Sequence, residues 1–251
     1  MRVMKRRGYQ TGFTIVELLI VIVIIGILAA ITIVAYNGIQ ERARLSSAMA
    51  FERQIHSKYG INATGDWSFD ECSGGTVKNN GTPQTTDTVM ISNAPGTPTW
   101  ATDTPTGRGC AMRFNGATRV ETTASLGGSL YVKAAWIRVA PSQACVNIMS
   151  RGVNNGADAP FWITGCRLTA GFQGNYSATF DTQTINDGKW HYVAVIWEDG
   201  NLTLYNDGKR VGTPFSAAPA PTPIGGTVSI GSHTTGNFFV GDIDNPFVAA
   251  E

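Results

Sequence analysis

The chain has 251 residues, of which 43% are hydrophobic and 15% are charged, so it is not a disordered tail and has enough apolar side chains for a core. The formal net charge is +1, but four of the 19 basic residues lie among the first seven, and the remainder is slightly acidic. A nucleic-acid-binding body needs a clustered basic face, so we expect no nucleic-acid partner. Most of the 29 glycines and 11 prolines follow residue 60 and predict a β-rich, turn-rich body.

An apolar stretch follows the basic start. No charged residue lies in 18–35, and a helix over 13–36 would be about 36 Å long at ~1.5 Å per residue. A bilayer core is ~30 Å thick, so this helix can span it once. The preceding positive charges predict that the N-terminus stays in the cytoplasm and that the chain after residue 36 is exported. The alternative, a cleaved secretory signal, fits less well, because the apolar run is longer than ~7–15 residues and no A-x-A site follows.

Glu17 is the acidic residue at the start of this stretch. A carboxylate at mid-membrane costs roughly 2.5–3.5 kcal/mol, and less near the end of the span, so such a residue usually has a partner. The alternative is a glutamate at the interface whose carboxylate reaches water.

Residues 5–36 resemble the N-terminus of a type IV pilin with a class III signal peptide. The resemblance rests on a short basic leader followed by GFTIVELL at residues 12–19. It implies that residues 1–12 are a leader, that a prepilin peptidase cuts between Gly12 and Phe13, and that Phe13 is N-methylated. It also implies that the Glu17 carboxylate pairs with the Phe13 ammonium of a neighbouring subunit. An ion pair inside an apolar bundle would fix the axial register, because leaving either charge alone is costly.

The helix is expected to continue to residue 59. No proline lies in 37–59, and the apolar residues of this stretch fall near one helical stripe. We therefore predict a helix over 13–59 whose second half is half-buried against a globular head; a free amphipathic stalk is the alternative. Gly60 and the run 62–65 predict a linker over 60–65.

The body over 66–251 has short alternating apolar runs separated by turn residues, which predict an all-β sandwich. Asp199-Gly200 and Asp207-Gly208 are two-residue turn signals and predict a meander of three antiparallel strands. The expected strands are 67–71, 110–114, 118–122, 130–139, 145–150, 161–164, 168–172, 190–197, 202–206, 228–230 and 238–243.

The same region resembles the laminin-G-like, concanavalin A-like jelly roll. The shared pattern is WHxVA at 190–194 and LYxDG at 204–208, with weaker matches such as WSFDE at 67–71 and FVGDID at 239–244. The resemblance implies an α+β chain, with one long helix followed by this sandwich. Related jelly rolls often bind calcium, so Asp242 and Asp244, which alternate on one strand, are calcium candidates; solvated strand ends are the alternative.

All four cysteines lie in the exported part, where disulfides persist. Four cysteines allow three connectivities. We expect Cys72–Cys110 and Cys145–Cys166, because each pair lies in sequence-adjacent β segments. Zinc is the alternative, but the sequence contains no CxxC and its three histidines are scattered.

The usual nucleotidase, zincin and serine-hydrolase motifs are absent, and the few glutamates of the body form no paired carboxylate motif, so we predict no enzyme. Sugar binding is an open alternative to a purely structural role. Trp100 and Trp162 are the surface candidates, whereas the strand tryptophans and His191 are expected to be structural.

Together these patterns predict a structural type IV pilus subunit without a resident cofactor, calcium aside. It would insert in the cytoplasmic membrane with its head outside and then polymerise with identical or related subunits into an extracellular fibre for adhesion or twitching motility. Its further partners would be the prepilin peptidase, the pilus assembly platform and a glycan or cell surface. The alternatives are a type II secretion pseudopilin and a membrane-anchored glycan-binding protein that does not polymerise.

Overall fold

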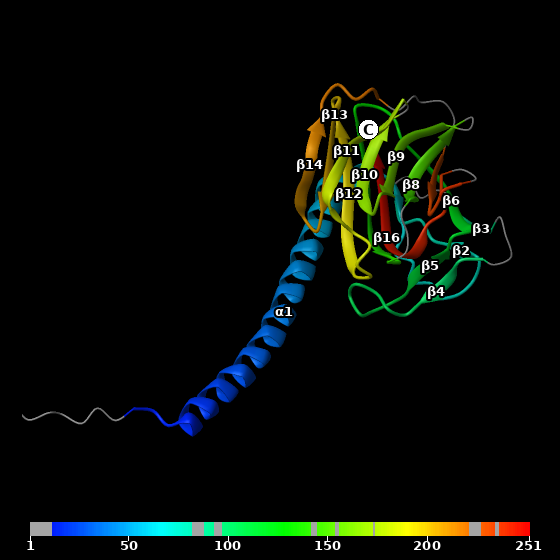
Figure 1. Ribbon diagram of the computed structural model, residues 1–251. Helices are drawn as coiled ribbons and strands as arrows, with labels where there is room; N and C mark the ends of the chain where they lie inside the picture. The colour runs from blue at the N-terminus through cyan, green and yellow to red at the C-terminus, as the bar shows by residue number, and fades with distance from the viewer. Residues whose placement is uncertain are drawn as a thin grey trace, which may run out of the picture. The chain divides into compact units, whose positions relative to one another are not determined.

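The computed structural model describes residues 12–81, 88–92, 97–141, 145–153, 156–172, 174–220, 227–233 and 236–251. The chain divides into two compact units, residues 1–44 and residues 45–251. Helix α1 (Ile15–Tyr59) contributes to both, and the described strands all belong to the second unit (Figure 1). This arrangement confirms the predicted α+β fold class. The expected leader lies outside the described residues, apart from Gly12.

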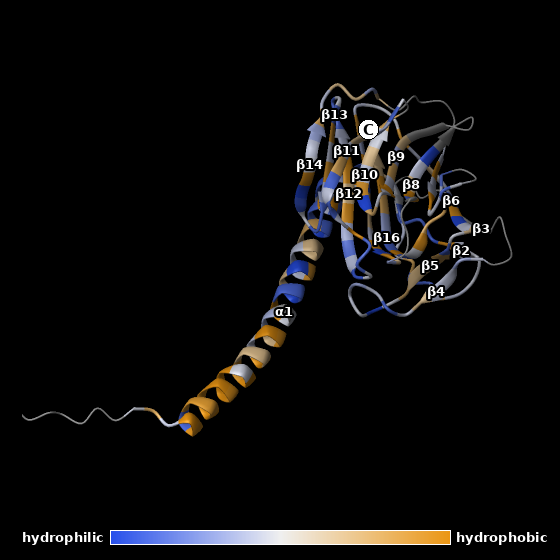
Figure 2. Ribbon diagram, in the orientation of Figure 1, coloured by the Kyte–Doolittle hydropathy of each residue, from blue (hydrophilic) through white to orange (hydrophobic). Residues whose placement is uncertain are grey.

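The first half of α1 is apolar on all sides (Figure 2). A window of it has a mean hydropathy of 3.3, and none of that window is buried within the chain. The helix is therefore long and apolar enough to cross a membrane.

The glycine and asparagine residues after the helix predicted a linker over 60–65, but these residues form regular structure instead. A 3-10 turn (η1, Gly60–Asn62) leads directly into strand β1 (Ala63–Asp66), which pairs with the last strand, β16.

The head is a sandwich whose first layer, sheet A, has the strand order β14-β13-β12-β7-β16-β5-β4, with β1 beside β16. Sheet B has the order β11-β10-β9-β8-β15-β6-β3-β2. The remaining strands of sheet A are β4 (Thr99–Ala101), β5 (Ala111–Asn115), β7 (Leu130–Val139), β12 (Trp190–Glu198), β13 (Asn201–Asn206), β14 (Lys209–Phe215) and β16 (Val240–Ala250). Sheet B consists of β2 (Thr76–Val77), β3 (Thr88–Ser92), β6 (Thr118–Ser125), β8 (Cys145–Val153), β9 (Gly156–Thr164), β10 (Arg167–Phe172), β11 (Asn175–Thr184) and β15 (Thr227–Ile230).

The central strands of sheet A are apolar on both faces, which explains why β7 and β12 read as continuous hydrophobic runs. In β7, Ala135 and Ile137 belong to the core between the sheets, whereas Ala134 and Trp136 belong to a second cluster that includes Ile55 of the helix. Successive strand residues point to opposite faces, so covering the outer face of sheet A with a helix buries the whole strand.

Lys133 is a charged exception in the core. It lies on β7 with no exposed surface, and its Nζ donates hydrogen bonds to the backbone oxygens of Met149 (3.3 Å) and Ala159. These carbonyls belong to β8 and β9, so the lysine ties sheet A to sheet B. A buried ammonium is tolerated only when its donors are satisfied.

The predicted meander is present as β12, β13 and β14, which pair antiparallel. Asp207 and Gly208 both have positive φ (49° and 79°), as the tight turn between β13 and β14 requires. The Asp207 carboxylate lies 2.8 Å from Nδ1 of His191 and accepts a hydrogen bond from the backbone N–H of Tyr192. His191 thus holds the turn, in keeping with the structural role expected for it.

The structure differs from the expected strands in several places: the expected ranges omit the short strands β1 to β4, and three further differences concern longer segments. Residues 67–71 form no strand: Trp67 and Phe69 are buried in the core, but Phe69 has a φ of 57° and the segment joins no ladder. Strand β11 was missed because it is mostly polar and exposed. Strand β16 extends beyond 243, because Asn245-Pro246 forms a bulge rather than the turn that these residue types suggest.

Candidate functional sites

The start of α1 is a capping box. The Glu17 carboxylate accepts hydrogen bonds from the backbone N–H and the hydroxyl of Thr14, at 2.8 and 2.7 Å. In return the Thr14 hydroxyl accepts from the backbone N–H of Glu17, at 3.2 Å. This role of Thr14 was not predicted, although its signature, Thr-x-x-Glu before an apolar run, is present in the sequence. Glu17 therefore has a partner, Thr14, within its own chain. The expected processing residues Gly12 and Phe13 lie just before this first turn of the helix.

The second half of α1 packs on the outer face of sheet A. Ala48, Ile55 and Tyr59 are buried there, as the helical stripe predicted. The Phe51 ring lies 5.0 Å from that of Tyr205, centroid to centroid, and is edge-on to Tyr192 at 6.1 Å. These contacts all lie within the unit 45–251, so residues 45–59 are part of the head rather than a free stalk.

Polar contacts fix the position of the helix on the sheet. The Ser47 hydroxyl donates to the backbone oxygen of Asp207 at 3.3 Å, and the Asn245 amide donates to Glu52 at 3.0 Å. A Cβ on Gly208 would lie 3.1 Å from Cβ of Phe51, so the β13–β14 turn packs closely against the helix. The bulge at Asn245 and the Asp-Gly turn thus both contribute to docking.

One of the two expected disulfides is described. Cys72 and Cys110 are bonded and link the segment after β1 to the start of β5. Cys145 pairs with Thr164 in the β8–β9 ladder, two residues before Cys166, but the side chain of Cys145 lies outside the described residues. The pairing Cys145–Cys166 stays a prediction.

The two carboxylates expected to bind calcium have other environments. Asp242 is buried and lies 2.8 Å from Nε of Arg113 and 2.9 Å from Nε of Arg138. The pKa of Asp244 is raised to about 8, chiefly by burial and to a smaller extent by the nearby carboxylates of Asp70 and Glu52, against a hydrogen bond from the N–H of Asn245 that lowers it. The described residues contain no group of three or more His, Cys, Asp or Glu side chains arranged to hold a metal. The arrangement gives the predicted calcium site no support.

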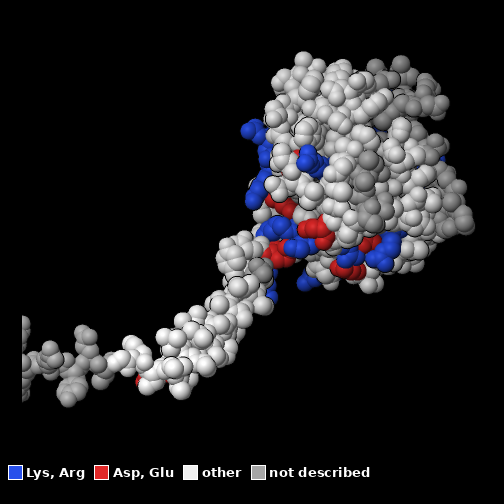
Figure 3. Space-filling view, viewed as in Figure 1, with Lys and Arg blue, Asp and Glu red and all other residues white. Residues whose placement is uncertain are grey.

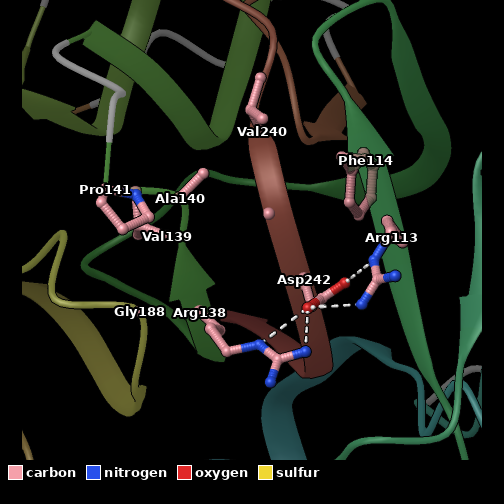
Figure 4. A pocket seen from close by; sticks show the side chains of 10 residues that line it. Arg113, Phe114, Arg138, Val139, Ala140, Pro141, Gly188, Val240 and Asp242 are labelled. Atoms are coloured by element: carbon pink, nitrogen blue, oxygen red, sulfur yellow. Dashed lines mark hydrogen bonds and ion pairs between the residues drawn. The ribbon is translucent and has the colours of Figure 1, made fainter.

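Arg113, Arg138 and Asp242 border a hollow of about 350 Å³ where β5, β7 and β16 meet (Figure 4). Both guanidiniums converge on the one carboxylate, which raises the pKa of Arg113, and Arg138 also pairs with Asp103. The charges cancel, so this hollow has no excess charge to attract an anion.

On the visible face of the head, charged side chains gather along one margin, and most of the remainder is uncharged (Figure 3).

The two candidate tryptophans lie in different sheets and do not form a common site. Trp100 is on β4 of sheet A and packs, partly buried, against the core. Trp162 is on β9 of sheet B, also partly buried, and its indole N–H donates to the backbone oxygen of Tyr176 at 3.0 Å. The Trp162 indole therefore reaches β11, the strand that was not predicted. Tyr176 and Phe180 are exposed residues of this strand.

Comparison with known proteins divides the chain in the same way. Residues 114–248, more than half of the chain, match the concanavalin A-like lectin/glucanases superfamily, and residues 7–33 match the prokaryotic N-terminal methylation motif.

The N-terminal part is similar to two curated pilins. The type IV major pilin protein PilE of Neisseria gonorrhoeae is 39% identical over 71 residues, which is 27% of this chain and 42% of PilE. The type IV major fimbrial protein FimA of Dichelobacter nodosus is 38% identical over 74 residues, 30% of this chain and 46% of FimA. The chain thus spans less than half the length of these relatives.

The head is similar in fold to domain 4 of AbnA, an extracellular arabinanase from Geobacillus stearothermophilus whose structure was solved with arabinotriose. The TM-score is 0.58 at 16% identity, over 75% of this chain and 92% of that domain. At this identity the likeness concerns the fold alone.

Proposed function

Because the chain belongs to the concanavalin A-like lectin/glucanases superfamily and carries a type IV pilin-like N-terminal region, we propose that it is a non-catalytic subunit of a type IV pilus that displays a β-sandwich for adhesion or motility. The observation that carries the proposal is the first half of α1. It is uncharged over residues 18–35, exposed throughout, and begins at Ile15, two residues after Phe13. Such a surface is costly in water and is stabilised by a membrane or by a bundle of like helices.

In this proposal a prepilin peptidase cuts between Gly12 and Phe13 on the cytoplasmic side, and Phe13 is then methylated. The apolar helices bundle into the core of the fibre, and each head, including residues 45–59, lies on its outside. The similarity of the N-terminal part to PilE and FimA supports this assembly. The capping box gives Glu17 a place in the monomer, from which its carboxylate would turn to the Phe13 ammonium of a neighbour.

The intact mass of the protein in sheared surface fibres tests the processing step. A chain that begins at Phe13 and carries one methyl group is the expected result. A chain that begins at Met1 in the membrane fraction, with none in fibres, would refute the pilin proposal and leave the anchored glycan-binding protein. Processed protein confined to short membrane-bound complexes would instead identify a secretion pseudopilin.

The substitution Glu17→Gln distinguishes the proposed ion pair between Glu17 and the Phe13 ammonium from the role of Glu17 in the capping box. Glutamine completes a capping box as well as glutamate does, but it cannot pair with an ammonium as an ion. We expect Glu17→Gln to reduce fibre yield as severely as Glu17→Ala, while Glu198→Gln, the same change at an exposed head position, leaves the yield unchanged. Normal fibres from Glu17→Gln would show that only the cap matters.

A further inference from the structure

The outer face of sheet B at β9–β11 carries an aligned row of side chains. Trp162 pairs with Thr169, and Thr169 pairs with Phe180. Neighbours across a ladder lie on the same face, and the alternate residues of β9 and β10 belong to the core. The row therefore faces away from the core, and the Trp162 indole reaches across β10 to donate a hydrogen bond to the Tyr176 backbone on β11.

Two aromatic rings of β11, one of them in this row, are exposed to solvent. Tyr176 is 42% exposed and Phe180 is 47% exposed, and they are the exposed large hydrophobic side chains among the described residues that follow Ile61. Single exposed apolar side chains need no explanation, but two aromatics on one strand beside a hollow form a surface that apolar C–H groups can cover.

The hollow beside Phe180 measures about 280 Å³, close to the lower end of the ~300–1,000 Å³ range of small-molecule sites. It has room for about one sugar ring. Its lining is made of Thr164, Gly165, Arg167, Thr169, Ser177 and Phe180. The polar groups are hydroxyls and one guanidinium, and the lining contains no carboxylate.

Arg167 gives the hollow its charge. Its side chain is exposed and forms no ion pair with the described residues. A guanidinium binds a carboxylate in bidentate geometry. The Thr and Ser hydroxyls of the lining can bond the hydroxyls of any sugar, but a neutral sugar leaves the guanidinium without a counter-charge. The lining thus complements a sugar that carries its own carboxylate.

We propose that this surface is a binding site for carboxylate-bearing glycans, with the sugar carboxylate on Arg167 and an apolar sugar face on the Phe180 ring. The Ser177 and Thr164 hydroxyls lie where the remaining sugar hydroxyls would be. The proposal deepens the proposed function, since it rests on the display of the head outside the cell, but the binding itself requires no fibre.

The test measures binding of the full-length chain, purified in detergent, to two matched probe pairs. These are sialyllactose against lactose, and trigalacturonic acid against its methyl ester. We expect at least one acidic probe to bind at least about tenfold more tightly than its neutral match, the range of one charge-assisted hydrogen bond. Absence of binding to all four probes, or equal affinity within both pairs, would overturn the proposal.

Variants then locate the site. Arg167→Gln is expected to abolish the preference for the acidic probe, and Phe180→Ala to weaken binding by about tenfold or more, with affinity restored in Phe180→Trp. Arg210→Gln, the loss of an exposed arginine on β14 outside the hollow, is the control and should bind normally. Unchanged binding in both Arg167→Gln and Phe180→Ala would place the site elsewhere. Fibre yield of these variants reports the proposed pilus function separately, and we expect it to be normal.

Discussion

Replacing Asp244 by asparagine should make the stability of the head less dependent on pH. Burial raises the pKa of Asp244 from its ordinary value of 3.8 to about 8. The folded state therefore keeps the proton at neutral pH, whereas the unfolded chain loses it above about pH 4. The folded state thus binds more protons, and the free energy of unfolding falls as pH rises between the two pKa values.

The slope follows from proton linkage. One proton held only by the folded state changes the free energy of unfolding by at most about 1.4 kcal/mol per pH unit, so the loss between pH 5 and pH 7 is at most about 2.7 kcal/mol. Asparagine cannot ionise, yet its oxygen can still accept the hydrogen bond from the N–H of Asn245. We therefore expect Asp244→Asn to be more stable than the parent at pH 8 and to lose less stability between pH 5 and pH 8.

Urea unfolding of the full-length protein in detergent measures this effect. All six tryptophans lie at or after residue 67, so their fluorescence reports on the head. Glu198→Gln removes an exposed carboxylate and serves as the control. Asp70→Asn should give part of the effect, because the Asp70 charge raises the pKa of Asp244. Parallel stability curves for Asp244→Asn and the parent across this pH range would refute the argument.

The same unfolding assay tests four further substitutions. Lys133→Met leaves two buried backbone oxygens without their donor and should cost about 1–3 kcal/mol; an unchanged midpoint would contradict this role. Tyr192→Phe should be neutral or stabilising by about 1 kcal/mol, since its buried hydroxyl has no hydrogen-bond partner among the described residues, and a clear loss would show a missing partner. Ile55→Ala opens a cavity under the helix, where Ile55 is 2% exposed, and should cost about 2–5 kcal/mol; a smaller effect would mean that the helix docks loosely. Cys72→Ser removes a disulfide that spans 38 positions and should cost about 2–4 kcal/mol, an effect that should disappear under reducing conditions.

The N-terminal region could be predicted in detail because its signals are local. An uninterrupted apolar run determines a helix long enough for a membrane, and Thr14 and Glu17 determine its first turn through contacts three residues apart. The Asp207-Gly208 turn is local in the same sense, because its positive φ values depend on the two residues that adopt them.

Strand boundaries were less predictable wherever the partner strand, rather than the residue type, decides the conformation. Asn245-Pro246 reads as a turn but is a bulge inside β16, held between β7 and β1. Trp67 and Phe69 alternate with polar residues as in a strand and are buried, yet their segment does not pair with a neighbouring strand. Polar β11 forms a strand because β10 pairs with it.

The sequence by itself determined the apolar helix, the Thr14 and Glu17 contacts at its start, the positions of most longer strands along the chain and the meander. Hydrophobic period and turn chemistry act over a few residues, which is why these features are local. Only the tertiary structure decided which side chains share a surface. It separated Trp100 from Trp162, placed Phe180 beside Arg167, and enclosed Asp242 between two arginines. Arg113, Arg138 and Asp242 come from strands far apart in the chain, and Phe180 reaches Arg167 through the pairing of β10 with β11; local residue patterns specify neither pairing.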